Sequence, residues 1–319
     1  MSAEKKVKPA YKAGFVAIVG RPNAGKSTLL NRLVGQKVAI VTSKPQTTRN
    51  RIQGIVSRND GQVVVIDTPG LHEARTVLNR QMMKEVAAAL EGIDVLVLMV
   101  DASEAARGRG GSVHVDPLLV ERAKRFEGRT ILALNKVDKT PKQVLLPLLE
   151  AFRKAHPFLA MVPVSALKGE GCEELLGEIM KQLPENDPYF PEDQVTDQPE
   201  RFLASEIVRE KAIALTYHEV PHALAVAVDK WEATPKMLRI QMTLTVERPA
   251  QKKIVIGHKG EMLKKIGTLA RKELEEILGE KIFLGLFVKV SESWRENPMA
   301  VRELDWHTQL EALGKHNAG

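Results

Sequence analysis

Short apolar runs recur through the first half of the chain, with amphipathic segments between them. The runs are six to eight residues long and nearly continuous in aliphatic residues, which is typical of strands buried on both faces of a mostly parallel sheet. They occupy residues 15–20, 63–68, 93–100, 130–136 and 160–166. Segments of helical period follow them at 26–33, 79–90, 117–125, 143–156 and 172–183. This alternation predicts an α/β fold, a doubly wound domain whose functional residues lie at the carboxyl ends of its strands.

The second half has a different order of elements. The pattern predicts a helix at 201–215, strands at 223–231 and 238–247, a helix–loop–helix pair, and a strand at 283–290. The stretch 184–200 has four prolines and no apolar period, which indicates a linker. We therefore divide the chain into a basic arm, an α/β domain, a linker, a smaller α+β domain and a C-terminal extension, at 1–13, 14–184, 185–200, 201–291 and 292–319.

Composition excludes several classes of protein. With 44% hydrophobic and 27% charged residues, the 319-residue chain is neither wholly disordered nor collagen-like. Its single cysteine, Cys172, excludes an intramolecular disulfide and a cysteine zinc site. The apolar run 93–100 is interrupted by Asp94 and is too short to span a membrane, and no apolar segment of a secretory signal precedes residue 15. We therefore expect a cytoplasmic protein.

Positive charge is unevenly distributed. The formal net charge is +7, with residues 1–184 at +10 (28 basic, 18 acidic) and residues 185–319 at −3 (19 basic, 22 acidic). Within the second part, residues 248–272 hold eight basic side chains and one acidic one, a local basic patch. The basic arm is most simply a solvated tail; attraction to anionic lipid or to RNA is the second interpretation.

A phosphate-binding motif directly follows the first apolar run. Residues 20–27, GRPNAGKS, satisfy G-x-x-x-x-G-K-[ST] between a predicted strand and a predicted helix. The glycines let backbone N–H groups surround a polyphosphate, and the helix adds its positive end. Lys26 would reach the β- and γ-phosphates, and the Ser27 hydroxyl would bind Mg²⁺. The motif predicts a nucleoside triphosphate and Mg²⁺ as ligands.

Two later motifs point to guanine as the base. Asn135-Lys136-Val137-Asp138 follows the fourth predicted strand, and Ser165-Ala166 ends the fifth. The Asp138 carboxylate can accept hydrogen bonds from N1–H and the 2-amino group of guanine, whereas adenine offers no such pair of donors. Downstream of a phosphate-binding loop, these residues predict GTP rather than ATP.

Two polar segments are candidates for nucleotide-dependent switches. Asp67-Thr68-Pro69-Gly70 ends the second predicted strand, where the carboxylate would hold the Mg²⁺ shell and the Gly70 N–H would meet the γ-phosphate. In the segment 43–49, SKPQTTR, a threonine hydroxyl would ligate Mg²⁺ and order the segment. Thr48 is the preferred ligand, with Thr47 as the alternative.

The motifs together resemble the Era family of KH-domain GTPases. The resemblance extends over nearly the whole chain, through GRPNAGKSTLLN, SKPQTTR, IDTPGLH and FPEDQVTDQPERFLASEIVREK. It implies a P-loop NTPase domain followed by a type II KH domain, GTP hydrolysis, binding to the 3′ end of 16S rRNA, and a role in assembly of the small (30S) ribosomal subunit. It also implies a monomer that does not bind DNA and that has weak peripheral contact with the membrane.

The resemblance assigns nucleotide-site residues by motif. The implied catalytic residues are Lys26, Asn23, Thr48 and Gly70, and the implied Mg²⁺ ligands are Ser27, Thr48 and Asp67. The implied GTP-binding residues are Gly20, Arg21, Pro22, Asn23, Ala24, Gly25, Lys26, Ser27, Thr28, Asp67, Thr68, Pro69, Gly70, Leu71, Asn135, Lys136, Asp138, Ser165 and Ala166.

One position departs from Ras-like GTPases. Leu71 follows Gly70, so the side chain there cannot orient the attacking water by a hydrogen bond. In related GTPases with this substitution a K⁺ ion held partly by the P-loop asparagine offsets the phosphate charge, and Asn23 occupies that place. K⁺ is therefore a second expected cofactor.

The basic patch of the second half contains a G-x-x-G loop, Gly257 to Gly260. In a KH domain such a loop lets phosphates of single-stranded RNA approach the backbone, with basic side chains around it. The expected RNA-binding residues are Lys252, Lys253, Ile256, Gly257, His258, Lys259, Gly260, Lys264 and Lys265. Bases would lie in an aliphatic groove beside Ile254, Ile256, Leu263 and Ile266, although these are equally plausible core positions.

Alternatives remain open at this point. The chain could be a GTP-binding RNA module with negligible turnover, or an RNA-modification GTPase, although no catalytic cysteine or second cofactor motif is evident. Residues 107–116 stand where the family has a shorter connection; a neutral surface insertion is the simplest interpretation, and a basic contact with rRNA or membrane is the alternative.

Overall fold

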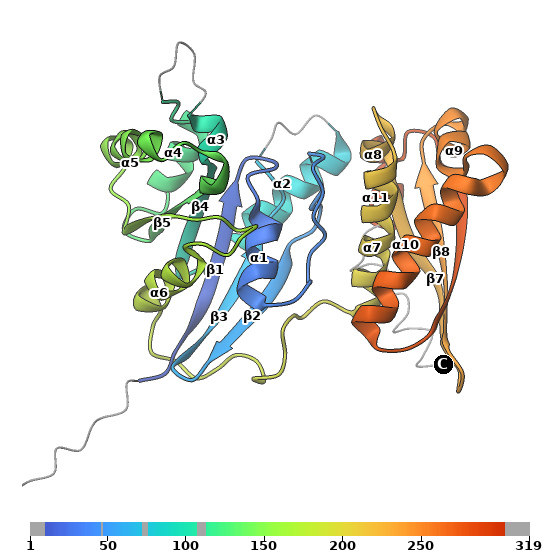
Figure 1. Cartoon of the computed structure of the whole chain (residues 1–319), viewed down its shortest axis with the longest axis horizontal. Helices are drawn as coiled ribbons and strands as arrows, with labels where there is room; N and C mark the ends of the chain where they lie inside the picture. The colour runs from blue at the N-terminus through green and yellow to red at the C-terminus, as the bar shows by residue number, and fades with distance from the viewer. Residues whose placement is uncertain (1–9, 46, 72–75, 107–112, 304–319) are drawn as a thin grey trace, which may run out of the picture. The chain divides into compact units, whose positions relative to one another are not determined.

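The computed structural model describes residues 10–45, 47–71, 76–106 and 113–303 (Figure 1). The described residues form two compact units: those within 10–39, 48–71 and 85–197 make up the first, and those within 40–47, 76–84 and 198–303 the second. The basic arm up to residue 9 and residues 107–112 of the predicted insertion lie outside the described residues.

The first unit is built on a six-stranded sheet. Its strands are β1 (Lys12–Gly20), β2 (Ile52–Arg58), β3 (Gly61–Asp67), β4 (Val95–Asp101), β5 (Thr130–Asn135) and β6 (Ala160–Pro163). They lie in the order β2-β3-β1-β4-β5-β6, and every neighbouring pair is parallel except β2 and β3. The five predicted strands are thus present, and the sheet confirms the expected P-loop architecture. The antiparallel edge strand β2 was not predicted.

Helices connect these strands (Figure 1). They are α1 (Lys26–Val34), α2 (Val77–Ala89), α3 (Ala102–Ala105), α4 (Pro117–Lys124), α5 (Lys142–Ala155) and α6 (Cys172–Gln182), with a 3-10 turn η2 (Val137–Lys139). Strands β3 and β5 are buried at every position, and β4 at every position but its last, which is why their sequences are continuous apolar runs. The polar residues that follow these strands are thereby fixed at one edge of the sheet.

Most of the predicted linker is bonded to the first unit. The Ile55 N–H donates to the Val195 carbonyl at 2.8 Å, and the Thr196 hydroxyl donates to the Gln53 carbonyl at 2.6 Å. The Gln62 side chain accepts the N–H groups of Tyr189 and Phe190 at 2.8 and 3.0 Å. Because these bonds use the backbone of an irregular segment, they leave no periodic signal in the sequence.

The second unit is an α+β fold. Its elements are α7 (Glu200–Leu215), α8 (Val220–Ala223), β7 (Ala225–Ala233), β8 (Leu238–Val246), α9 (Pro249–Ile256), η3 (His258–Gly260), α10 (Glu261–Leu278), β9 (Ile282–Val290), η4 (Trp294–Glu296) and α11 (Pro298–Glu303). The sheet order is β7-β8-β9, with β8 antiparallel to β7 and parallel to β9. Helices α7 and α10 pack against each other, and their apolar faces share one core with the sheet (Figure 1). This order confirms the smaller domain predicted from the sequence.

The described residues contain no helix that is both long and apolar enough to cross a lipid bilayer. Peripheral contact with a membrane stays a prediction.

Candidate functional site

The phosphate-binding loop connects β1 to α1 in a conformation that requires its glycines. Gly25 has φ 102°, and a Cβ atom there would lie 2.3 Å from the Asn135 amide nitrogen. A Cβ atom on Gly20 would lie 2.4 Å from the Met99 carbonyl oxygen. Asn23 also has a positive φ, 61°. The loop therefore approaches Met99 of β4 and Asn135 of β5 so closely that positions 20 and 25 have no room for a side chain.

Lys26 closes the loop from inside. Its ammonium donates to the carbonyls of Gly20 and Arg21 at 3.2 and 3.1 Å, and the residue is only 6% exposed. Burial lowers the pKa of Lys26, while the nearby Asp67 carboxylate opposes that shift. The structure thus places a cation where the loop would wrap a polyphosphate.

The three predicted magnesium ligands lie together. The Ser27 hydroxyl donates to Asp67 Oδ2 at 2.6 Å and lies 2.9 Å from the Thr48 hydroxyl, which is 3.4 Å from the same oxygen. Asp67 is fully buried, and its Oδ1 atom has no hydrogen-bond partner among the described residues. Burial raises the pKa of Asp67, although the Lys26 charge and the hydroxyls oppose this. Two hydroxyls and a carboxylate with one unbonded oxygen form an oxygen-only set that suits Mg²⁺.

The alternative ligand, Thr47, is engaged elsewhere. Its hydroxyl bonds to the Thr42 hydroxyl at 2.6 Å and donates to the Lys44 carbonyl at 2.8 Å. Among the described residues, no group of three or more His, Cys, Asp or Glu side chains offers a different metal site. The geometry therefore favours Thr48.

The guanine motif divides into a positioning residue and an exposed acceptor. Asn135 donates to the Ala24 carbonyl at 2.7 Å and accepts the Ala166 N–H at 3.0 Å, so it ties the phosphate loop to the Ser165-Ala166 turn. Asp138 is only partly buried and accepts a hydrogen bond from the Ser165 hydroxyl at 2.7 Å. Ser165 thus orients the carboxylate that would meet the base.

Two acidic residues at this edge were not found from the sequence. Asp101, at the end of β4, pairs with Lys136 at 2.6 Å and caps α3. Asp116, the N-cap of α4, accepts two hydrogen bonds from Arg21 of the phosphate loop at 2.5 and 3.1 Å. Each joins a nucleotide motif to a neighbouring helix. Their only sequence signal is their place at the start of a helix.

The residues after β3 are closely packed. A Cβ atom on Gly70 would lie 2.8 Å from Pro22 Cα, so a larger residue would push the two loops apart. Leu71 is 8% exposed, and its N–H donates to the Gly20 carbonyl at 3.1 Å. The Thr68 hydroxyl donates to the Ile18 carbonyl at 2.9 Å, so its side chain is directed into the sheet. Only its backbone is left for a nucleotide.

The G-x-x-G loop of the second unit joins α9 to α10 through positive-φ residues. Gly257, Lys259 and Gly260 have φ of 74°, 47° and 85°. A Cβ atom on Gly257 would lie 2.7 Å from Met262 Cβ, whereas one on Gly260 would meet open space. His258 and Lys259 are exposed. The loop therefore presents two side chains and its backbone to solvent.

A groove of about 460 Å³ opens from this loop along α10 and β9. Its lining is Gly260, Leu263, Lys264, Gly267, Thr268, Arg271, Phe283, Leu284 and Leu286. Of the four aliphatic residues predicted to form it, only Leu263 does so. Ile266 is fully buried in the core, and Ile254 and Ile256 on α9 do not line the groove. The α10 period alone could not reveal that β9 supplies the opposite wall.

The predicted lysines are distributed around the groove rather than along it. Lys264 lines the groove, and Lys253 and Lys265 are exposed outside it. Lys252 is partly buried on α9. A polyanion in the groove would meet Lys264 and Arg271 directly, and the others only through longer-range attraction.

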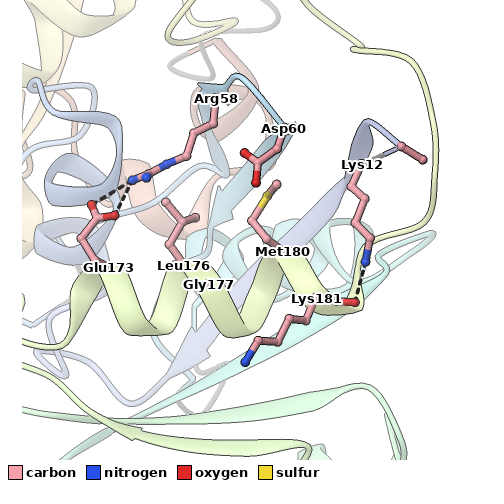
Figure 2. A pocket seen from close by; sticks show the side chains of 9 residues that line it. Lys12, Arg58, Asp60, Glu173, Leu176, Gly177, Met180 and Lys181 are labelled. Carbon is pink, nitrogen blue, oxygen red and sulfur yellow. Dashed lines mark hydrogen bonds and ion pairs between the residues drawn. The ribbon is translucent and has the colours of Figure 1, made fainter. Parts of the chain in front are cut away.

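A separate pocket of about 360 Å³ lies beside α6 and the β2–β3 turn (Figure 2). Figure 2 shows Arg58 paired with Glu173, at 2.6 Å, and the Lys12 ammonium bonded to the Lys181 carbonyl, at 2.8 Å. None of the predicted site residues lines this pocket. The Lys181 ammonium also pairs with Glu178 at 2.6 Å, so Arg58 and Lys181 are both neutralised by surface carboxylates.

Family models match both units. Residues 15–136 match the 50S ribosome-binding GTPase family, and residues 219–295 match the KH domain family. The first match covers the phosphate loop and the sheet from β1 to β5, and the second covers β7 to β9 together with the G-x-x-G loop. They support assigning nucleotide chemistry to the first unit and the KH fold to the second.

Full-length relatives show the same combination. The chain is 47% identical to GTPase Era of Syntrophus aciditrophicus, covering 93% of this chain and 96% of that protein. It is 44% identical to GTPase Era of Geotalea uraniireducens, covering 93% and 98%.

Two solved structures are similar over almost their whole length. One is a variant of Era from Aquifex aeolicus bound to GDP·AlF4⁻, with a TM-score of 0.87, 44% identity, and coverage of 92% and 99%. The other is Era in complex with MgGDPNP and nucleotides 1506–1542 of 16S ribosomal RNA, with a TM-score of 0.88, 44% identity, and coverage of 93% and 99%. On this identity and coverage, the chain belongs to the Era family of GTPases.

Proposed function

We propose that this GTPase is a nucleotide-dependent switch that binds the single-stranded 3′ end of 16S rRNA and acts in maturation of the small ribosomal subunit. The observation that carries the proposal is the pairing, in one chain, of a converged Ser27–Thr48–Asp67 site with a groove of mixed apolar and basic lining behind a basic G-x-x-G loop. A relative that is 44% identical holds MgGDPNP and 16S rRNA nucleotides together.

In the nucleotide site, this chain's residues bind and orient. Asp138, held by Ser165, would accept the N1–H and 2-amino groups of guanine. Lys26 would meet the β- and γ-phosphates, and Ser27, Thr48 and Asp67 would hold Mg²⁺. When bound, Mg²⁺ neutralises charge on the two phosphates that separate. The Gly70 N–H would contact the γ-phosphate, so that hydrolysis would release this contact.

A buried Leu71 cannot orient the attacking water, so another source of stabilisation is needed. Asn23 is exposed at the tip of the phosphate loop, and we expect it to contribute to a K⁺ site next to the phosphates. We expect hydrolysis to be faster in KCl than in NaCl, with Asn23→Ala abolishing the difference. Equal rates in both salts would exclude a role for K⁺.

In the second unit, phosphates would lie against the G-x-x-G backbone and bases in the groove. Phe283, Leu284 and Leu286 provide the apolar wall, while Lys264 and Arg271 provide positive charge. The Gly267 position keeps the groove open, since a Cβ atom there would lie 3.4 Å from Leu286.

The test is GTP hydrolysis in K⁺ buffer with and without an oligonucleotide of the 16S rRNA 3′ end. The matched variant replaces His258 and Lys259 by aspartate, which leaves both loop glycines in place. A Gly257 substitution is less suitable because its Cβ would collide with Met262. RNA stimulation that is lost in the variant would support the switch. Hydrolysis that ignores RNA in both proteins would contradict it, and negligible turnover in wild type would favour a GTP-binding module.

A further inference from the structure

The residues that precede Thr48 belong to the second unit, where they contact α7. The Val41 N–H donates to Glu210 Oε1 at 2.8 Å, and the Arg209 guanidinium donates to the Thr47 carbonyl. Lys44 also lies over the Tyr217 ring, 5.3 Å from its centroid. The Arg209-Glu210-Lys211 sequence is part of the segment that resembles the Era family, yet neither the nucleotide site nor the RNA groove uses it.

Arg209 is a rigid, buried group. Its side chain is 2% exposed, and two of its nitrogens pair with the two Glu206 oxygens, each at 2.6 Å. A buried guanidinium in a planar, two-bonded pair has little freedom to reorient. Its bond to the Thr47 carbonyl therefore fixes that backbone position.

Glu210 belongs to a second, connected set of charges. Its Oε2 atom lies 2.8 Å from the Lys211 ammonium, which also pairs with Glu273 on α10. Burial disfavours the charge on Lys211, but the hydrogen bonds that its ammonium donates to the two carboxylates outweigh this and raise its pKa. Because α10 begins at Glu261, directly after the G-x-x-G loop, the same charges contact both the residues before Thr48 and the RNA-facing helix.

We propose that Arg209 and Glu210 are positioning residues that hold the backbone at Val41 and Thr47 so that Thr48 stays beside Ser27 and Asp67. We further propose that the Lys211–Glu273 pair links these contacts of Arg209 and Glu210 to α10, the helix that follows the G-x-x-G loop. The proposal rests on the proposed function in one respect, the use of Thr48 by Mg²⁺ and GTP. A segment that is already ordered costs less to fix when a ligand binds. The contacts of Arg209 and Glu210 therefore favour the binding of GTP, which uses Thr48, over the binding of GDP.

The first experiment measures the affinities of fluorescent GTP and GDP analogues in Mg²⁺ without RNA. In Glu210→Ala the Val41 N–H loses its acceptor, and we expect the preference for GTP over GDP to fall about tenfold, within the usual range of coupling between sites. Glu210→Gln keeps an acceptor oxygen and should retain most of the preference. Glu276→Ala, an exposed position on α10, is the matched control.

Hydrogen exchange at the Val41 amide gives an independent readout, and we expect faster exchange in Glu210→Ala only. A wild-type GTP preference in a variant whose Val41 amide has lost protection would overturn the proposal. If Glu210→Ala does not fold, Arg209→Lys keeps the charge but not the planar fork and should lower the same preference. A wild-type protein that binds neither nucleotide would instead contradict the proposed function.

The second experiment adds the RNA oligonucleotide. In Glu273→Ala we expect the GTP preference without RNA to be unchanged and the increase caused by RNA to disappear. A normal response to RNA in Glu273→Ala would overturn the link through Lys211.

Discussion

The nucleotide site and the RNA site are built in opposite ways. Lys26, Asp67 and Asn135 are at most 6% exposed, and each is hydrogen-bonded to neighbouring loops. His258, Lys259 and Lys264 are exposed side chains around a shallow groove. The first site is fixed before its ligand arrives, so single changes should have large, specific effects. The second depends on charge and apolar contact, so its effects should be graded and sensitive to salt.

The two largest effects are expected in the nucleotide site, and the first of them is at Asp67. Asp67→Asn removes the buried charge that would hold Mg²⁺, and we expect GTP hydrolysis to fall on the order of 100-fold. Burial raises the pKa of Asp67, which means that the folded protein disfavours the charged form of this side chain. A neutral asparagine should therefore not lower the midpoint temperature of unfolding. Asp60→Asn, in the β2–β3 turn, is the matched control. Wild-type hydrolysis in Asp67→Asn would show that this carboxylate does not serve the metal.

Asp138 should decide which base is bound. Asp138→Asn replaces one acceptor oxygen of the carboxylate by an NH₂ donor, which no longer matches the two donors of guanine. We expect GTP affinity to fall about 100-fold or more while the affinity for xanthosine triphosphate rises. Ser165→Ala removes only the hydroxyl that orients Asp138, so a smaller loss, about fivefold, is expected. Competition binding with both nucleotides measures the two effects. Equal losses for GTP and xanthosine triphosphate would argue against base recognition by Asp138.

At the RNA site the effect should appear in the salt dependence. If Lys259 and Lys264 each neutralise one phosphate, replacing both by glutamine should lower the slope of log affinity against log salt by about 1.4. GTP affinity should not change. RNA titrations between low and moderate salt provide the slope, and an unchanged slope would place the phosphates elsewhere.

The smallest effect is expected at Asp101. Burial opposes the charge on Asp101, but hydrogen bonds from Lys136 and Ser103 prevail and lower its pKa. Because the pKa of Asp101 is lower in the folded protein than the ordinary value of 3.8, its ionisation stabilises the fold at pH values above 3.8. This stabilisation is lost as the pH falls through the pKa of the folded state. Asp101→Asn should therefore reduce stability at pH 7 by about 1 kcal/mol or less, given solvent screening. Chemical unfolding curves should converge in acid; a constant difference would contradict this.

The sequence predicts the parts of each site that depend on local spacing. The phosphate loop, Asp67-Thr68-Pro69-Gly70 and Asn135 to Asp138 each lie within a few residues at the end of a strand, so short-range motifs locate them. Asp101, Asp116 and the β9 wall of the groove come from distant segments, and their contribution arises only when the sheets assemble. The same holds for strand β2, whose partner fixes it, and for Ile266, whose burial depends on its place on α10.

We expect GTP and RNA binding to be coupled in this chain. The most direct measurement is the dissociation constant of the 16S rRNA 3′-end oligonucleotide with Mg²⁺ and either a non-hydrolysable GTP analogue or GDP. Coupling between sites is reciprocal, so we expect RNA binding to be at least about fivefold tighter with the GTP analogue. Equal dissociation constants with the two nucleotides would contradict the coupling and leave two independent binding units.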